Sequence, residues 1–132
     1  MDLAIPPNIS LPRVARLSQF ITIQALFRVH PGRREIVDRL LVELDRRASD
    51  EPLVLFHEAS FHSDNLALRI AYPSAVSLLD HLAGSSDGFE RLLSETDLIR
   101  MEVHGPEAEL SQLRGPLGVF QPDWFVLAAP RS

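Results

Sequence analysis

The chain has 132 residues, a length that supports one hydrophobic core and therefore one domain. Its formal net charge is −5 and its 13 basic residues are all arginine, which argues against nucleic-acid binding and excludes a lysine nucleophile or Schiff base. The lack of cysteine excludes disulfides, thiolate metal sites and cysteine nucleophiles within this sequence.

Residues 1–18 are predicted to form an irregular N-terminal arm, followed by a single domain over residues 19–132. Pro6, Pro7 and Pro12 interrupt the arm, which lacks the early basic region and the unbroken apolar stretch of a signal peptide. No apolar run approaches the ~20 residues that a membrane helix needs. We therefore expect a cytoplasmic protein that does not associate with a membrane.

Residues 20–29 have the alternation of a strand with one face in the core. The apolar face consists of Ile21, Ile23, Ala25, Phe27 and Val29. The mixed face consists of Phe20, Thr22, Gln24, Leu26 and Arg28. After Pro31-Gly32, apolar residues recur at helical spacing from Ile36 to Ala48, which predicts a helix that ends before Pro52.

The second half of the chain continues with short elements. Residues 53–61 and 66–71 are predicted as strands joined at the turn residues Ser63-Asp64-Asn65. Ser74 has the character of an N-cap for a second helix, residues 84–88 are predicted as a loop, and 89–94 as a further helical turn. A fourth strand is predicted over 98–104, a short helix over 107–114 and a final strand over 123–128.

This order predicts an α+β, ferredoxin-like β-α-β-β-α-β domain with an added C-terminal helix and strand, an antiparallel sheet, and both main helices on one sheet face. The other face carries Phe20, Leu26 and further apolar groups. Because a partly apolar sheet face is unfavourable in water, we predict that two copies pair as a homodimer.

The segment FITIQALFRVHPGRREIVDRLL resembles the opening strand, Pro-Gly turn and first helix of antibiotic-biosynthesis-monooxygenase-like proteins. EPLVLFHEASF and LALRIAYPSAVSLLDHL continue the resemblance over residues 20–104, with His81-Leu82 at the family's His-Leu pair, and MEVHGPEAELSQLRGPL looks like an extension found in some members. The resemblance implies a dimeric α/β barrel with apolar pockets. The family includes cofactor-free oxygenases of anthrones and quinols and haem-degrading enzymes, and related barrels cyclise polyketides.

The sequence departs from this family in its third predicted strand and in its first. The acidic residue usual ahead of the third-strand aromatic is missing, and Tyr72 stands where the family has tryptophan, which disfavours haem degradation. An asparagine that several oxygenases use in the first strand has no evident match, and Gln24 is the nearest amide. These departures weaken the transfer of a specific activity but not of the fold.

His57 and His81 are the candidate catalytic residues, since either imidazole can act as a general base near neutral pH. The alternative for each is a hydrogen-bonded structural histidine. His57 and Glu58 point to opposite faces of the second strand, so only one of them can line a pocket. The candidate substrate-binding residues are Phe20, Thr22, Gln24, Leu26, Phe56, Arg69, Tyr72, His104 and Trp124.

No metal or cofactor is expected. His57, Glu58 and His62 lack the helical four-residue spacing of a zinc-protease pair, and no glycine-rich phosphate loop is present. The segment 84–88 has the Gly-x-Ser-x-Gly pattern of a nucleophile elbow but follows a predicted helix instead of a strand.

Three functions stay open. The first is a cofactor-independent monooxygenase that oxidises anthrone- or quinol-type aromatic polyketides. The second is a polyketide cyclase of the same barrel type that does not use O2. The third is a non-catalytic dimeric carrier or sensor of a hydrophobic metabolite. All three require a small aromatic or polyketide-like molecule, and only the first two require a base.

Overall fold

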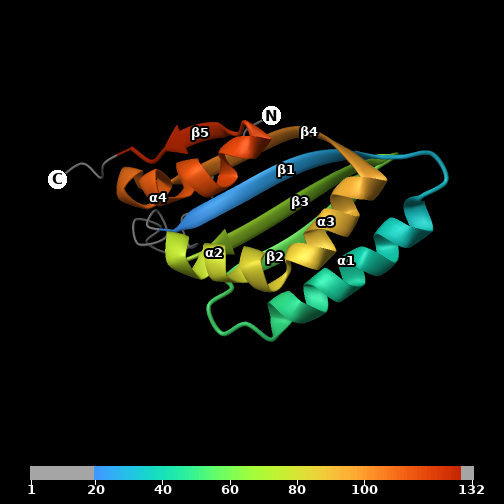
Figure 1. Ribbon diagram of the computed structural model, residues 1–132, viewed down its shortest axis with the longest axis horizontal. Coiled ribbons are helices and arrows are strands. Elements are labelled where there is room, and N and C mark those ends of the chain that lie inside the picture. Colours follow the sequence, from blue (N-terminus) through green and yellow to red (C-terminus); the bar gives the residue numbers. More distant parts are fainter. Residues whose placement is uncertain (1–19, 129–132) are drawn as a thin grey trace, which may run out of the picture.

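The structure is a computed structural model that describes residues 20–128, so the predicted N-terminal arm lies outside the described residues. A five-stranded sheet is covered on one side by helices (Figure 1). The elements are β1 Ile21–Val29, α1 Arg34–Ser49, β2 Phe56–His62, β3 Asn65–Tyr72, α2 Ala75–Gly84, α3 Ser86–Glu95, β4 Thr96–Gly105, α4 Glu107–Leu117, the 3-10 turn Gly118–Phe120 and β5 Asp123–Val126. No helix within residues 20–128 is long and apolar enough to cross a membrane.

The strand order is β2-β3-β1-β4-β5, which confirms the predicted α+β, ferredoxin-like arrangement. One correction concerns β5, which pairs with β4 in parallel, so the sheet is only mostly antiparallel. The reason is the connection: α4 carries the chain back along the sheet, and a helical crossover joins parallel strands. A second difference is α3, a full helix of 10 residues where a loop and one helical turn were predicted.

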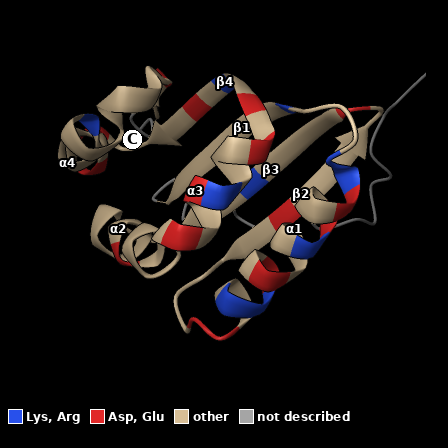
Figure 2. Ribbon diagram, turned by 45° about the vertical axis from the view of Figure 1, so that its right-hand side comes forward, with Lys and Arg blue, Asp and Glu red and all other residues tan. Residues whose placement is uncertain are grey.

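The predicted alternation of the first strand holds in β1. Its odd-numbered residues from Ile21 to Val29 are buried against the helices, and its even-numbered residues lie on the other face, called here the open face. The register places Ile23 opposite Ile70 of β3 and Val103 of β4, so one apolar layer runs across the sheet. The helix α1 contributes its buried face to the same core, and its charged residues lie on its outer side (Figure 2).

The edge strand β2 begins at Phe56, later than predicted. Its ladder with β3 extends from Phe56 opposite Ala71 to His62 opposite Asn65, and β3 ends at Tyr72, so residues 53 and 54 have no strand to pair with. Ser63 and Asp64 form the hairpin turn, in which Ser63 adopts a positive φ of 54°. The register of this hairpin determines which β2 side chains face the helices.

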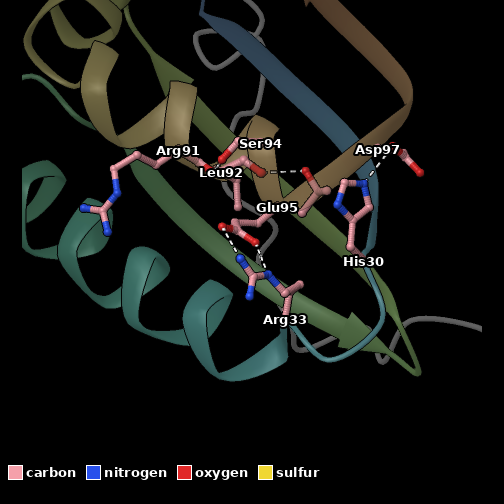
Figure 3. A network of polar contacts seen from close by, with 8 residues as sticks. His30, Arg33, Arg91, Leu92, Ser94, Glu95 and Asp97 are labelled. Atoms are coloured by element: carbon pink, nitrogen blue, oxygen red, sulfur yellow. Dashed lines mark hydrogen bonds and ion pairs between the residues drawn. The ribbon is translucent and has the colours of Figure 1, made fainter.

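The loop between β1 and α1 is tied to the start of β4 by a polar network (Figure 3). His30 Nε2 lies 2.9 Å from Asp97 Oδ1, and Arg33 donates to both carboxylate oxygens of Glu95, at 2.6 and 3.2 Å. Arg33 is exposed and pairs of this kind contribute little to stability, but a bidentate arginine fixes geometry well. The network holds α1 and α3 in place above the sheet.

Gly88 permits the close approach of α3 to α1, and we expect Gly88→Ala to lower the free energy of unfolding by about 1–3 kcal/mol. A Cβ at this position would lie 2.7 Å from Cδ2 of the buried Leu44. Gly84→Ala is the matched control, because its Cβ would meet nothing within 4 Å. Urea denaturation measures both variants, and equal stability would contradict the tight α1–α3 contact.

Candidate functional site

A cavity of about 360 Å³ lies between the helix-covered face of the sheet and the helices α2, α3 and α4. The residues that line it from the sheet are Ile23, Ala25, Phe27, Leu68, Ile70 and Met101. Those from the helical side include Leu79, Leu82, Phe89, Leu93, Leu117 and Phe120. This volume and this apolar lining are typical of a binding site for a small molecule.

The small side chain of Ala25 helps to explain where the cavity lies. Ala25 sits in the middle of the apolar face of β1, opposite Leu68 and Met101, while larger residues occupy the neighbouring inward positions. The polar members of the lining are Ser86 and Glu90, one turn apart on α3, and both are exposed. The cavity is therefore apolar inside and polar along its α3 rim.

Four polar residues form a partly buried cluster beside this cavity. Glu51, from the loop after α1, accepts a hydrogen bond from the hydroxyl of Tyr72 at 2.6 Å on one carboxylate oxygen. Nδ1 of His81 lies 2.6 Å from the other oxygen. The rings of His81 and Tyr72 are stacked with centroids 5.0 Å apart, and the ring of His57 packs edge-on against His81 at 5.8 Å.

The hydrogen bonds of Glu51 define the tautomer of His81. An ionised carboxylate only accepts hydrogen bonds, so Nδ1 of His81 carries a hydrogen, and in the neutral form of the ring the lone pair is on Nε2. Nε2 of His81 and Nε2 of His57 are both buried and have no hydrogen-bond partner within the described part of the chain. Buried polar atoms without a partner are costly and rare, so these two imidazole nitrogens stand out from the rest of the described side chains.

Several pKa values in the cluster are displaced. Burial acts to raise the pKa of the Glu51 carboxyl, but the hydrogen bonds from His81 and Tyr72 outweigh it, so this pKa lies below its usual value. Burial and the hydrogen bond to Glu51 raise the pKa of the Tyr72 hydroxyl well above its usual range. Burial, followed by the proximity of His81, lowers the pKa of His57. The cluster therefore favours an ionised Glu51, a neutral Tyr72 and a neutral His57.

Two residues connect the cluster to the cavity. The ring of Phe89, on α3, packs edge-on against His81 with centroids 5.8 Å apart, and Phe89 also lines the cavity. Ile70 lines the cavity as well and lies directly opposite His57 in the β2–β3 ladder. His81 is thus separated from the apolar cavity by the ring of Phe89. Within residues 20–128, no group of three potential metal ligands comes together.

The structure resolves the ambiguity at His57 and Glu58. The side chain of His57 is only 5% exposed and faces the helices, whereas Glu58 lies on the open face, 3.5 Å from Arg69. His57, His81 and Tyr72 are therefore the three predicted site residues that the fold brings together. Glu51, which completes the cluster, was missed, because nothing in the loop after α1 indicates that its carboxylate contacts His81, 30 residues further along the chain.

The other predicted substrate-binding residues lie away from the cavity. Those that share the open face of the sheet are Thr22, Gln24, Leu26, Phe56, Arg69 and His104. Phe20 is half-buried just before β1. Trp124 of β5 faces the helices, but it packs beside Arg114 of α4 and does not line the cavity. The open-face residues thus belong to the opposite surface of the sheet and do not line this cavity.

No protein-family model matches the sequence, and no curated protein matches it. Among solved structures, MupZ from Pseudomonas fluorescens has a TM-score of 0.78 and 28% identity, over 86% of this chain and 94% of MupZ. A proposed antibiotic biosynthesis monooxygenase from Chloroflexus aurantiacus has a TM-score of 0.57 and 19% identity, over 67% of this chain and 93% of that one. SnoaB, a cofactor-independent oxygenase from Streptomyces nogalater solved as a variant, has a TM-score of 0.57 and 12% identity, over 64% of this chain and 90% of SnoaB.

The chain therefore has the ferredoxin-like fold of the antibiotic-biosynthesis-monooxygenase-like proteins, which confirms the sequence resemblance at the level of the fold. The unit from Ile21 to Gly105 makes up about two thirds of the chain, whereas the likeness to MupZ covers 86% of it. The similarity to MupZ thus extends beyond the ferredoxin-like unit.

We expect the folded protein to lose stability as the pH falls below 6.5, because His57 stays neutral in the fold but takes up a proton in the unfolded chain near that pH. Because folding lowers the pKa of His57, this residue makes its full contribution to the free energy of unfolding above pH 6.5, and the contribution declines as the pH falls below 6.5. The depressed pKa of Glu51 adds a separate loss only below its ordinary value of 4.5.

Urea midpoints measured between pH 7.5 and 5 test this expectation. His57→Gln should flatten the decline below pH 6.5, whereas the control His62→Gln, on an exposed residue at the end of β2, should leave it unchanged. An unchanged decline in the His57 variant would show that this residue is not the group responsible.

Proposed function

We propose that this protein is a cofactor-independent oxygenase that deprotonates a hydrophobic substrate with His81 and lets the resulting anion react with O2. One observation carries the proposal: Nε2 of His81 is an unpartnered buried base, held in its tautomer by Glu51, beside an apolar cavity. A histidine oriented by a carboxylate is a recurrent arrangement for a general base.

In this reaction the substrate supplies the electrons. His81 Nε2 accepts a proton from an activated CH2 group, the carbanion transfers one electron to O2, and the two radicals combine. The peroxide takes the proton back, then His81 removes the second carbon-bound proton as hydroxide leaves. The net change converts CH2 and O2 into a carbonyl and water, so atoms and electrons balance without another reductant. The apolar cavity keeps water away from the reactive anion.

Access to the base depends on Phe89. His81 is fully buried, and Phe89 contacts it from the cavity side. A substrate in the cavity reaches Nε2 once the half-buried ring of Phe89 turns aside. The family resemblance and the structural similarity to SnoaB, a cofactor-independent oxygenase, support an oxygenase reaction, while anthrones and quinols are the substrates that the family resemblance implies.

Anaerobic hydrogen exchange tests the base without O2. In D2O, the protein should accelerate deuterium incorporation at the acidic CH2 of an anthrone, and His81→Gln should abolish the acceleration. Exchange that is independent of His81 would overturn its assignment as the base. A substrate that exchanges and cyclises but consumes no O2 would indicate the cyclase instead.

A carrier or sensor of a hydrophobic metabolite is the second candidate, favoured by the complete enclosure of His81. The carrier has the same cavity but performs no proton transfer. Ligand affinity that survives His81→Gln, with no exchange and no turnover in the unmodified protein, would identify it.

We also propose that the open face pairs with a second copy of the chain. This face presents Leu26, Phe56 and Phe125 together with groups of both signs, among them the Arg69–Glu58 pair and the Arg100–Asp123 pair. A surface that mixes apolar groups with both charges can be complementary to itself across a twofold axis.

Leu26→Glu should convert the dimer to a monomer, because it places a charge at the centre of the buried face. Light scattering after size exclusion measures the mass, and Val42→Glu on the outer side of α1 is the matched control, since Val42 is 60% exposed. A monomeric unmodified protein, or a Leu26 variant that stays dimeric, would contradict this interface.

A further inference from the structure

We infer that the cavity selects molecules whose outer end is a neutral or cationic hydrogen-bond donor and that Glu90 rejects carboxylates. This inference rests on the proposed function only in using the same cavity as the binding site. Among residues 20–128, Glu90 is the one ionisable side chain in the cavity lining. It lies one turn from Ser86 on α3, so a carboxylate and a hydroxyl share one side of the rim.

In the part of the chain that the structure describes, no arginine lines the cavity to neutralise Glu90. The two arginines that border the α1–α3 groove together with Glu90 have other partners: Arg47 donates to the carbonyl of Gly84 at 2.8 Å, and Nη1 of Arg91 lies 3.9 Å from Glu43. Arg114 of α4 pairs with Glu107. Glu90 itself forms no ion pair with a described residue, so its charge acts on whatever occupies the rim.

The surface beyond the rim does not offset the charge of Glu90. Glu90 also borders a shallow polar groove between α1 and α3, where charges of both signs alternate on the helices (Figure 2). The charged residues of this groove are Glu43, Asp87, Glu90, Arg47 and Arg91, three carboxylates against two arginines. Without Glu90 the groove charges balance, so an incoming anion meets one uncompensated carboxylate at the rim, whereas an amine or a hydroxyl group can donate a hydrogen bond to it.

The inner and outer ends of the cavity thus favour different chemical groups on a ligand. The inner end, at Phe89 and Ile70, adjoins the histidine cluster, and the walls between the ends are apolar. The fitting ligand is an apolar ring system that bears an acidic C–H at its inner end and a hydroxyl or amino group at its outer end.

Three fluorescent probes that differ only in the polar group test this specificity: 9-anthracenemethanol, 9-(aminomethyl)anthracene and 9-anthracenecarboxylate. Titration of the full chain should give affinities for the alcohol and the amine about tenfold higher than for the carboxylate. Glu90→Gln should remove most of this difference by improving carboxylate binding and leaving alcohol binding unchanged. Glu43→Gln is the matched control, because Glu43 borders the outer groove but not the cavity, and it should retain the discrimination.

Equal affinities for all three probes, or the same discrimination in the Glu90 variant, would overturn the inference. Failure of every probe to bind would overturn it as well, because it would show that the cavity is not a ligand site. The test needs binding only, so a protein that discriminates among the probes but consumes no O2 would contradict the proposed oxygenase and leave the specificity of the rim intact.

Discussion

Glu51→Gln should lower kcat for oxidation of an anthrone by about 10²–10⁴-fold, the range typical of losing general base catalysis. The amide no longer holds the imidazole of His81 through a charged hydrogen bond, so the tautomer with a free Nε2 lone pair loses its preference. Ligand affinity should change little, because Glu51 does not line the cavity. The effect should therefore appear in kcat and not in binding.

Glu35→Gln provides the matched control, since this glutamate is exposed in the first turn of α1, away from the cavity and the histidine cluster, and should leave kcat unchanged. Nitrogen chemical shifts of the His81 ring give a second readout: the unmodified protein should show a protonated Nδ1, and the Glu51 variant a mixture of tautomers. Full activity in a correctly folded Glu51 variant would remove the carboxylate–histidine pair from the mechanism.

Ala83→Trp should weaken ligand binding by at least about 100-fold, equivalent to roughly 3 kcal/mol. Ala83 lines the cavity at the C-terminal end of α2 and is exposed, so an indole there fills the mouth without entering the protein core. The free energy of unfolding should therefore stay close to that of the unmodified protein.

Val76→Trp is the control for this variant. Val76 lies on the same helix and is 60% exposed, but it does not line the cavity, so ligand titrations should be unaffected. Unimpaired binding to the Ala83 variant would mean that the ligand enters by a different route or occupies a different surface.

Most of the fold follows from local patterns in the sequence. The alternation in residues 20–29 and the helical spacing from Ile36 to Ala48 report which faces meet in the core, and the structure has both elements at those places. The direction of β5 was not predictable in this way. It depends on how α4 packs over the sheet, a long-range contact that hydrophobic periodicity and secondary-structure propensity do not predict.

The candidate site was only partly predictable. His57 and His81 were identified one at a time by their residue type and context, but their contact at 5.8 Å depends on the packing of α2 against β3 and β2. Glu51 carries no local signal, because its role arises when the loop after α1 folds back beneath His81. The cavity is formed jointly by three helices and the sheet, so no single segment of the sequence indicates it. The substrate-binding residues were therefore predicted mostly on the mixed strand faces, where polar side chains could be recognised from the sequence.

Oxygen uptake by the metal-stripped protein is the most direct test of the proposed oxygenase activity. With a panel of anthrones and quinols, we expect protein-dependent uptake of one O2 per substrate and, for the anthrones, a product with one added oxygen atom and two fewer hydrogens. Both the uptake and the product should be lost in His81→Gln. Absence of uptake with panel members that are shown to bind in the cavity would contradict a cofactor-independent oxygenase.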